Sequence, residues 1–521
     1  MRKRLVMGAA LVVILALLGV GCGGGKTPAP SQQPVQEFVL LVNNLPKNID
    51  PAKASGNPEL EQMRAAYETL VEVDPETKEL KPVLAKAWQS SPDRSEWTVK
   101  LREGVKFHDG STLTAEGVKS ALERSIKIGA GESYLIASSI QSMEAADSLT
   151  LKFQLKGSEP EFIYSLSRIF IPSAEAIKAH DKGDMAQEWL SQNEAGSGPY
   201  RMVSWEKEQR LVLEKFPEYW RGWEGKHIDR YVFQVVPEPG TQRLMMERGD
   251  GDFADSIVAD DAKALESNAN LQVLACTGAN PMYIQFNPTG PLKDVRVRRA
   301  IATAFNYTAM IEDVMKGYAA PLRGPAPEAL IGFNQELQQV KYDLEGAKKL
   351  LQEAGVKNLK LTYMYFQPWL FEKSAGLMLQ EALKDMGMTL EIEAQPWATF
   401  VEKVKNPQTR PNMGMVAVYV PSPTVGPLLR TMFHSSSQGH WAYWGYNNPE
   451  VDRLLDQAKT EIDDARRLGI YQQIQKILYD DYAAIWVMNK PDIHVFKKNV
   501  KGYQYNPFYP LILNYYGLYK E

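Results

Sequence analysis

The side chains that could perform catalysis are sparse in this sequence and form no recognised catalytic pattern. Six histidines occur in 521 residues, and none has the His-Glu-x-x-His spacing that places two imidazoles around zinc. A complete phosphate-binding loop ending in Gly-Lys-Ser/Thr and a Gly-x-Ser-x-Gly nucleophile elbow are also missing. We therefore predict no catalytic residue, no metal ligand and no cofactor, and we expect that the chain is not an enzyme.

Two short motifs could still suggest chemistry. His108-Asp109 combines a base with a carboxylate, but such a pair in a hairpin more often makes turn hydrogen bonds. Gly249-Asp250-Gly251-Asp252 spaces two carboxylates as a calcium loop does, but Ala254 stands where the third oxygen ligand should be. We interpret both motifs as structural turns.

The strongest local signal is a cysteine near the N-terminus. Residues 2–4 are basic and precede a mostly apolar run over 5–20, which is shorter than the roughly 20 residues that span a bilayer. Residues 1–21 are therefore predicted to be a secretory signal peptide. Cys22 follows directly and resembles the cleavage site of a bacterial lipoprotein, which implies that Cys22 is lipidated and becomes the first mature residue. Residues 22–36 are rich in Gly, Pro, Ser and Gln and are predicted to form a flexible tether.

The composition sets limits on the class of protein. The formal net charge is −4, and no block of basic residues occurs, so a nucleic-acid partner is not expected. The chain is 44% apolar and long enough for more than one domain, because single cores stop growing near about 250–300 residues. The chain has two cysteines, which do not suggest a disulfide framework despite the predicted export.

The body of the chain alternates irregularly between strand and helix patterns. Glu96–Leu101 alternates apolar and polar residues and is predicted to be a strand. Thr114, Asp294 and Asp343 each precede apolar residues at helical spacing and are predicted to begin helices. The apolar residues of Glu59–Val71 predict a further helix. Without any repeat period, the mixture indicates an α/β (mixed α+β) protein.

Several sequence blocks together resemble one known family over nearly the whole mature chain. The blocks are Leu84–Trp88 with Glu96–Gly110 and Leu113–Glu116, Gly196–Tyr200 with Trp205 and Pro217–Trp220, Asp294–Ile301, Tyr342–Gly355, and Tyr446–Asp452. In residue type and order they resemble the peptide/nickel class (family 5) of extracellular solute-binding proteins, the oligopeptide- and dipeptide-binding lipoproteins of ATP-driven (ABC) importers. Chance does not supply so many matches in the right order.

The resemblance implies the fold, the partners and the location. It implies a two-lobed, periplasmic-binding-protein-like fold in which an extra domain is inserted into the first lobe. The boundaries that we expect are 37–80, 195–285 and 490–521 for lobe I, 81–194 for the extra α/β domain, and 286–489 for lobe II. The implied partners are the permease and ATPase subunits of an importer, and the implied location is the outer face of the cytoplasmic membrane, where the chain is a monomer held through Cys22.

The resemblance also shows where the ligand site departs from that of dipeptide binders. In those proteins an aspartate in a loop after a strand receives the peptide ammonium group, and Tyr419 occupies that position here. An arginine before a proline receives the peptide carboxylate, and Gln367-Pro368 is the matching pair. A tyrosine hydroxyl can accept a hydrogen bond from an ammonium group but supplies no countercharge at neutral pH. Both charges that recognise a short zwitterionic peptide are therefore predicted to be absent.

Aromatic residues remain at the expected cleft. The resemblance places Trp397 in the cleft, and Trp369 and Tyr419 could complete an aromatic wall for rings, apolar side chains or cations. Gln367, Arg323 and Asn57 are candidate polar contacts. For each of these residues, ordinary burial or a place in a solvated loop is the alternative interpretation.

Four functions remain open on the sequence alone. The first is a receptor that captures a peptide between two hinged lobes and delivers it to a membrane permease. The second is the same receptor role for a non-peptide solute, such as an oligosaccharide, a metal chelate or another small organic molecule. The third is a lipoprotein hydrolase or chaperone, against which the missing nucleophile–base pattern argues. The fourth is a signalling receptor that does not feed a transporter.

Overall fold

The computed structural model describes residues 35–54, 60, 62–418, 420, 422–437, 444–509 and 513–521. The predicted signal peptide, the lipidation site Cys22, and the candidate contacts Asn57 and Tyr419 lie outside the described residues. The chain divides into two units, of which the compact one runs from Gln36 to Glu521. Within the described ranges, no helix is both long and apolar enough to cross a membrane.

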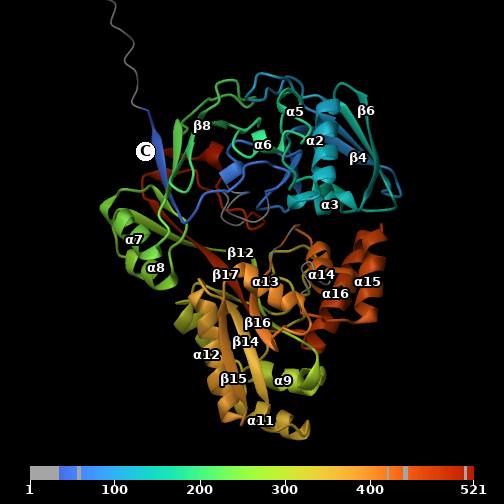
Figure 1. The fold of residues 1–521 in the computed structure, drawn as a ribbon, viewed down its shortest axis with the longest axis vertical. Coiled ribbons are helices and arrows are strands. Elements are labelled where there is room, and N and C mark those ends of the chain that lie inside the picture. Colours follow the sequence, from blue (N-terminus) through green and yellow to red (C-terminus); the bar gives the residue numbers. More distant parts are fainter. Residues whose placement is uncertain are drawn as a thin grey trace, which may run out of the picture. The chain divides into compact units, whose positions relative to one another are not determined.

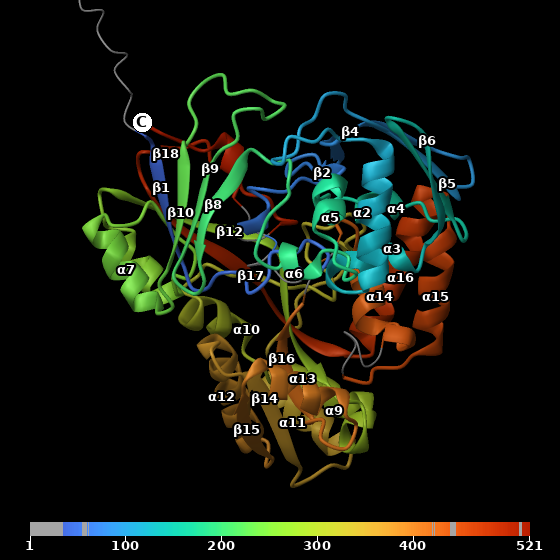
Figure 2. The same ribbon diagram turned by 45° about the horizontal axis from the view of Figure 1, so that its top comes forward.

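One long mixed sheet organises this compact unit (Figures 1 and 2). Its strands, in spatial order, are β15 (Thr389–Gln395), β14 (Lys360–Phe366), β16 (Met413–Ala417), β12 (Leu271–Phe286), β17 (Ala484–Lys497), β11 (Phe253–Ala254), β1 (Glu37–Val42), β10 (Arg230–Val235), β9 (Arg210–Lys215) and β8 (Tyr200–Glu206), and β13 (Ala320–Pro321) pairs with β17. We call the side with β1 and β8–β11 lobe I, and the side with β14–β16 lobe II. Strands β12 and β17 belong to both.

Lobe I is built around β1, which pairs in parallel with β10 and β11. The residues of β1 alternate between partly and fully buried before three consecutive buried positions, as expected for a strand covered on both faces. The helices α7 (Pro239–Arg248) and α8 (Ala259–Leu265) pack beside this part of the sheet (Figure 1). The C-terminal strands β18 (Val500–Lys501) and β19 (Tyr519–Lys520) form a small hairpin on the same side.

A second, antiparallel sheet forms the inserted domain. Its order is β4 (Ala85–Ser90), β5 (Glu96–Leu101), β7 (Thr150–Leu155) and β6 (Ile140–Asp147), and α2 (Ala115–Ile128) packs against it (Figure 1). Strand β5 has the predicted bounds and buries Trp97, Val99 and Leu101 on one face. Thr114 caps α2 as predicted, because its side chain accepts a hydrogen bond from the N–H of Gly117.

The helix predicted over Glu59–Val71 is wrong for most of its length. Residues 64–66 form turns, and strand β2 (Val71–Val73), which pairs with β3 (Leu80–Pro82), begins where the helix was expected to end. The carbonyl groups of Ala65 and Ala66, which a helix would use internally, accept hydrogen bonds from the N–H groups of Tyr200 and Gly198 instead, at 3.0 and 2.8 Å. Tertiary hydrogen bonds therefore override the local helical pattern.

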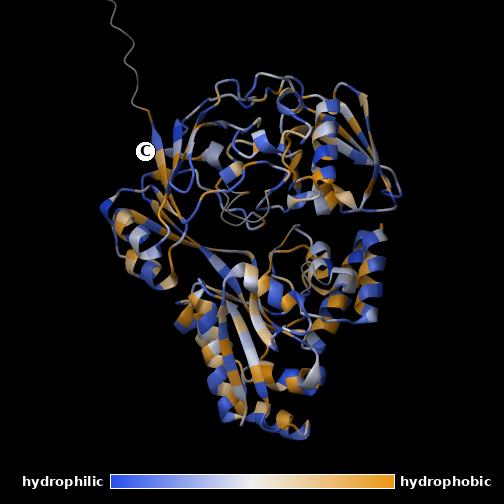
Figure 3. Ribbon diagram, viewed as in Figure 1, coloured by the Kyte–Doolittle hydropathy of each residue, from blue (hydrophilic) through white to orange (hydrophobic). Residues whose placement is uncertain are grey.

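Lobe II is a three-layer arrangement. Its parallel strands β14, β15 and β16 are flanked by amphipathic helices, which Figure 3 shows as orange and blue segments side by side on the same helix. The helices are α9 (Val295–Thr303), α11 (Leu344–Glu353), α12 (Leu370–Asp385), α13 (Trp397–Lys405), α14 (Val425–Phe433), α15 (Pro449–Thr460) and α16 (Asp464–Asp480). Asp294 and Asp343 cap α9 and α11 as predicted, since their carboxylates accept the N–H groups of the first turn.

The long strands β12 and β17 carry the chain between the lobes, and the register of their pairing shifts twice, between Thr277 and Pro281 and between Met282 and Tyr283. Leu271–Thr277 pairs with residues 491–497 in lobe I, and 281–285 pairs with 484–489 in lobe II. Residues 278–280 are left out of the ladder between these two stretches. The bulge is held by side chains. The amide of Asn489 donates to the carbonyl of Gly278 and accepts the N–H of Asn280 at 2.9 Å.

Candidate ligand-binding cleft

The carboxyl ends of the parallel strands β14, β15 and β16 lie at the same edge of lobe II. Phe366 at the end of β14 is in register with Gln395 at the end of β15, and β16 runs parallel to β14. Ala417 at the end of β16 pairs with Met282, which follows the bulge in β12 directly. This edge therefore faces the stretch of β12 and β17 that passes between the lobes, which we call the crossing. Ligands of open α/β sheets bind outside the carboxyl ends of the strands.

An aromatic group occupies the loops at this edge. The ring centroid of Phe366 lies 5.3 Å from that of Trp369 and 5.7 Å from that of Trp397. Trp397 begins α13 and stacks on the buried ring of Phe400 at 5.7 Å. The structure thus brings two predicted site residues together through Phe366. Trp397 is 47% exposed, which is unusual for so large an apolar side chain and leaves part of its ring accessible to a ligand.

Gln367 lies beside this aromatic group, on the same loop. Its side chain is exposed, and its backbone N–H donates to the carbonyl of Gln395 at 3.0 Å, which ties the β14 loop to the end of β15. The third loop is tied to the crossing, because the N–H of Val418 donates to the carbonyl of Pro281 at 3.0 Å. Tyr419 would follow on this loop, and its expected contact with a ligand stays a prediction.

Arg323 lines a cavity of about 300 Å³ beside the bulge between the lobes. The cavity is bounded by β13 and by the bulge residues Gly278 and Asn489. The guanidinium of Arg323 makes an ion pair with Glu328 at 2.9 Å, and its Cζ lies 4.8 Å from the ring centroid of Phe333. Neither Trp369 nor Trp397 is among the described lining of this cavity, so Arg323 is not brought together with them, and its charge is already partly satisfied.

The sequence interpretation missed Glu372, which lies beneath the aromatic group in the first turn of α12. One carboxylate oxygen accepts the N–H of Phe366 at 2.9 Å. The other oxygen, Oε1, has no hydrogen-bond partner among the described residues, and the side chain is 1% exposed. Burial raises the pKa of Glu372 to about 8. The available signal was an acidic residue at the third position of a helix, where glutamate commonly caps the turn before it.

His108 and Asp109 take part in the scaffold of the inserted domain. His108 Nδ1 lies 2.7 Å from Glu194 Oε2, and its Nε2 lies 2.9 Å from the carbonyl oxygen of Gly198. Burial alone would lower the pKa of His108, but these two acceptors outweigh burial and raise it. Because both ring nitrogens face acceptors, the imidazole holds both protons. Asp109 accepts the N–H of Ser111 at 2.9 Å in a tight turn.

Comparison with known proteins identifies the family. Residues 79–440 match the family described as "Bacterial extracellular solute-binding proteins, family 5 Middle". The chain belongs to this family. The family, the mixed α/β two-lobed fold and the receptor role predicted from the sequence are thereby confirmed. This family 5 protein is a solute-binding receptor of an ABC importer, and its family works on the extracellular or periplasmic side of the membrane.

Individual relatives cover nearly the full length of this family 5 protein. It is 30% identical over 477 residues to the "Probable D,D-dipeptide-binding periplasmic protein DdpA" of Escherichia coli (strain K12), with 90% of this chain and 91% of the relative covered. It is 29% identical over 499 residues to the glutathione-binding protein GsiB of Pectobacterium atrosepticum, covering 93% and 95%. The structure of the periplasmic binding protein DppA of Helicobacter pylori in complex with the peptide STSA has a TM-score of 0.81 at 23% identity, covering 93% and 98%.

Proposed function

We propose that this receptor binds a peptide at the lobe II edge formed by the carboxyl ends of β14, β15 and β16, and that binding favours closure of lobe I onto this edge. The observation that carries the proposal is the exposed Trp397, held by Phe366 and Phe400 at an edge that faces the crossing. Relatives named for dipeptide and glutathione binding support a peptide as the ligand. A ligand that touches both lobes only when they are closed stabilises the closed form.

The proposed site recognises side chains and backbone more than terminal charges. Gln367 is exposed at this edge and carries no charge, and the aromatic group offers flat apolar surface. Arg323 is paired with Glu328 in the neighbouring cavity. We therefore expect peptides longer than two residues or bearing apolar side chains to bind better than small zwitterionic dipeptides, because charge-assisted hydrogen bonds to the termini are not the main contribution.

The test is a thermal-unfolding screen of the purified processed chain with di- to pentapeptides. A ligand at 100 times its Kd adds about 2.7 kcal/mol to the free energy of unfolding, so a true ligand raises Tm measurably. Trp397→Ala should lower the affinity for that peptide about tenfold or more, since aromatic contacts in a buried site carry much of the binding energy. The matched control is Tyr342→Ala, an exposed aromatic residue at the start of α11. No response to any peptide, or an equal loss in both variants, would reject the proposal.

A second candidate is a non-peptide solute, and the partly exposed ring of Trp397 favours it specifically. Sugars and other ring-bearing molecules stack on such rings. The same screen with oligosaccharides and metal chelates separates the two candidates. A Tm rise with one of these, in the absence of a rise with every peptide, would replace the peptide by that solute class.

The same proposal includes an anchor and the absence of catalysis. We propose that the processed chain is a monomer anchored through lipid at Cys22 to the outer face of the cytoplasmic membrane, which the basic residues, the short apolar run and the cysteine support. Intact mass should show an acylated chain beginning at Cys22, and Cys22→Ser should release the protein from membranes.

We also propose that it binds without catalysis, as its relatives are named for binding. Product release from a panel of chromogenic esters and peptides would contradict this.

A further inference from the structure

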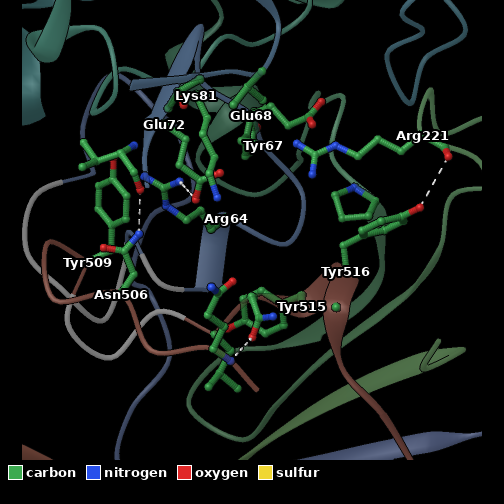
Figure 4. Close-up of a pocket in the computed structure, with 18 of the residues that line it drawn as sticks. Arg64, Tyr67, Glu68, Glu72, Lys81, Arg221, Asn506, Tyr509, Tyr515 and Tyr516 are labelled. Atoms are coloured by element: carbon green, nitrogen blue, oxygen red, sulfur yellow. Dashed lines mark hydrogen bonds and ion pairs between the residues drawn. The ribbon is translucent and has the colours of Figure 1, made fainter. Parts of the chain in front are cut away.

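A cavity of about 530 Å³ lies in lobe I, away from the edge with the aromatic group (Figure 4). Its described lining comes from residues 64–83, Arg102, Pro199, the turn that includes Tyr219–Arg221, and the C-terminal residues 504–509 and 513–517. No residue of 286–489 is among this lining, so the cavity does not depend on lobe II. Its size is within the about 300–1,000 Å³ that is usual for small-molecule sites.

The walls of the cavity are fixed by hydrogen bonds between distant segments. The hydroxyl of Tyr509 accepts the N–H of Val73 at 3.2 Å, and the amide of Asn506 donates to the carbonyl of Val73 at 2.9 Å. These bonds dock the C-terminal segment on the β2–β3 hairpin. Tyr509 is 2% exposed and Asn506 is 9% exposed. Tyr509 and Asn506 therefore fix one wall of the cavity against β2.

Cationic side chains outnumber carboxylates on these walls. Arg64, Lys81, Arg102 and Arg221 line the cavity, against Glu68 and Glu72. The buried carboxylate of Glu68 is already satisfied, because it accepts hydrogen bonds from the side chains of Ser197, Tyr219 and Trp220 at 2.9–3.0 Å. Lys81 is paired with Asp74 and Arg64 contacts Glu72, so Arg102 and Arg221 are the lining cations that have no ion pair among the described residues.

Arg64 and Arg221 keep N–H donors that the described residues do not fully use. Arg64 is 12% exposed; its Nε is buried, its Nη2 donates to the carbonyl of Ser167 at 3.2 Å, and its Nη1 makes only a long contact with Glu72, at 3.5 Å. Arg221 makes no ion pair within 4.0 Å in the described part of the chain. Burial raises the pKa of Glu68 and the charge of Arg221 opposes that shift, while the guanidinium of Arg221 lies against two aromatic rings. Figure 4 shows Arg64 and Arg221 reaching into the pocket from opposite sides.

Aromatic rings back both guanidinium groups. The Cζ of Arg64 lies 3.9 Å from the ring centroid of Tyr509. The Cζ of Arg221 lies 4.7 Å from the ring of Trp220 and 5.8 Å from the ring of Tyr516. Such stacking orients the guanidinium plane without using its N–H groups. The exposed N–H groups of Arg221, together with Nη1 of Arg64, are then available for hydrogen bonds to a carboxylate.

We propose that this lobe I cavity is a second ligand site, separate from the cleft, that binds a small planar organic carboxylate. The carboxylate accepts hydrogen bonds from Arg221 and Arg64, and the planar part of the molecule packs against the rings of Trp220, Tyr509 and Tyr516. Because lobe II contributes none of the described lining, the site binds its ligand without closure of the lobes. Occupancy stabilises the contact between the β2–β3 hairpin and the C-terminal segment.

The test uses the full processed chain in mild detergent and isothermal titration with 4-hydroxyphenylacetate as the probe. We expect saturable binding at one site, and about tenfold or greater weakening for the neutral amide of the probe, which cannot form a charge-assisted pair. Arg221→Met should weaken binding by a similar factor, because it removes the charge from an exposed position. Arg201→Met, at an exposed arginine of β8, is the matched control and should bind normally.

Further arms of the experiment separate this site from the cleft and from simple anion binding. Trp397→Ala should leave binding of the probe intact, and inorganic phosphate should bind much more weakly because it has no planar part. The proposal is overturned by a lack of saturable binding, by equal binding of the amide or of phosphate, by normal binding to Arg221→Met, or by loss of binding in Trp397→Ala. Failure of the peptide screen for the cleft leaves these outcomes unaffected.

Discussion

Buried charges near the inserted domain are matched by partners from distant segments, whereas the buried carboxyl group beneath the lobe II edge is left half satisfied. Asp50 and Arg124 form two hydrogen bonds at 2.8 and 2.6 Å, and His108 is matched by Glu194. Glu372 keeps an oxygen without a partner among the described residues. The difference indicates that the first region is a rigid scaffold, while the edge that we propose for ligand binding stores unsatisfied polar and exposed aromatic groups.

The largest expected effect comes from breaking a matched pair. Arg124→Ala should lower the free energy of unfolding by about 3–5 kcal/mol, because Asp50, which is 0% exposed, would keep an uncompensated charge. Urea denaturation measures the change. The control is Lys476→Ala, which removes an exposed ion pair with Asp480 on α16 and should cost about 0–1 kcal/mol. Equal effects of the two variants would contradict the description of a scaffold built on buried pairs.

The second prediction concerns His108, whose folded-state pKa is raised. A raised pKa contributes stability that is fully present below the unfolded value of about 6.5 and is lost as pH rises through the folded value. His108→Gln should lower the free energy of unfolding by about 2 kcal/mol at pH 6 and should flatten the decline above that pH. Denaturation at several pH values tests this, with the exposed His180→Gln as the control. If the free energy of unfolding fell with pH equally in the wild type and in His108→Gln, His108 would be excluded as the source of the decline.

The third prediction concerns Glu372, whose substitution should stabilise the protein, whereas substitution of His108 should destabilise it. The pKa of Glu372 is raised from 4.5 to about 8, so the free energy of unfolding should fall as pH rises through this window. Glu372→Gln keeps an acceptor for the N–H of Phe366 and removes the titration. It should therefore stabilise the protein at pH 8.5 by at least about 1 kcal/mol and change little at pH 5. Glu381→Gln, at an exposed position of α12, should have no such pH dependence. Destabilisation at both pH values would show that the carboxylate is needed.

The smallest expected effect on stability is that of Trp397→Ala. Trp397 is 47% exposed, so its loss should change the free energy of unfolding by less than about 1 kcal/mol, even though we expect the affinity for the ligand to drop. Denaturation without ligand, set beside a binding titration, separates these two quantities. A loss of several kcal/mol in stability would mean that Trp397 supports the fold of lobe II more than it supports ligand binding.

Local patterns predicted much of the fold. The strand Glu96–Leu101 and the capping residues Thr114, Asp294 and Asp343 were identified correctly, because alternation and side-chain caps are encoded within a few residues. The helix expected over Glu59–Val71 failed because its carbonyl groups bind a segment more than 130 positions away in the chain. No local pattern records such a contact.

The candidate sites were less accessible from sequence. Trp397 was predicted through resemblance to a family and Trp369 as a further part of an aromatic wall, and their common partner Phe366 appeared only in the structure. Glu372 was missed because its importance comes from burial, which depends on how α12 packs on the sheet. The lobe I cavity could not be predicted at all, since Arg64 and Arg221 line the same cavity only after distant parts of the chain have assembled.

The interrupted pairing of β12 and β17 has a consequence for the range of cargo. Residues 278–280 leave the ladder and a second shift of register follows Met282, while the side chain of Asn489 hydrogen-bonds to the backbone of Gly278 and Asn280. We infer that rotation between the lobes is taken up at this irregular stretch, because the regular ladders on either side resist bending. On this inference, molecules of different length are accommodated by the loops at the ends of the strands.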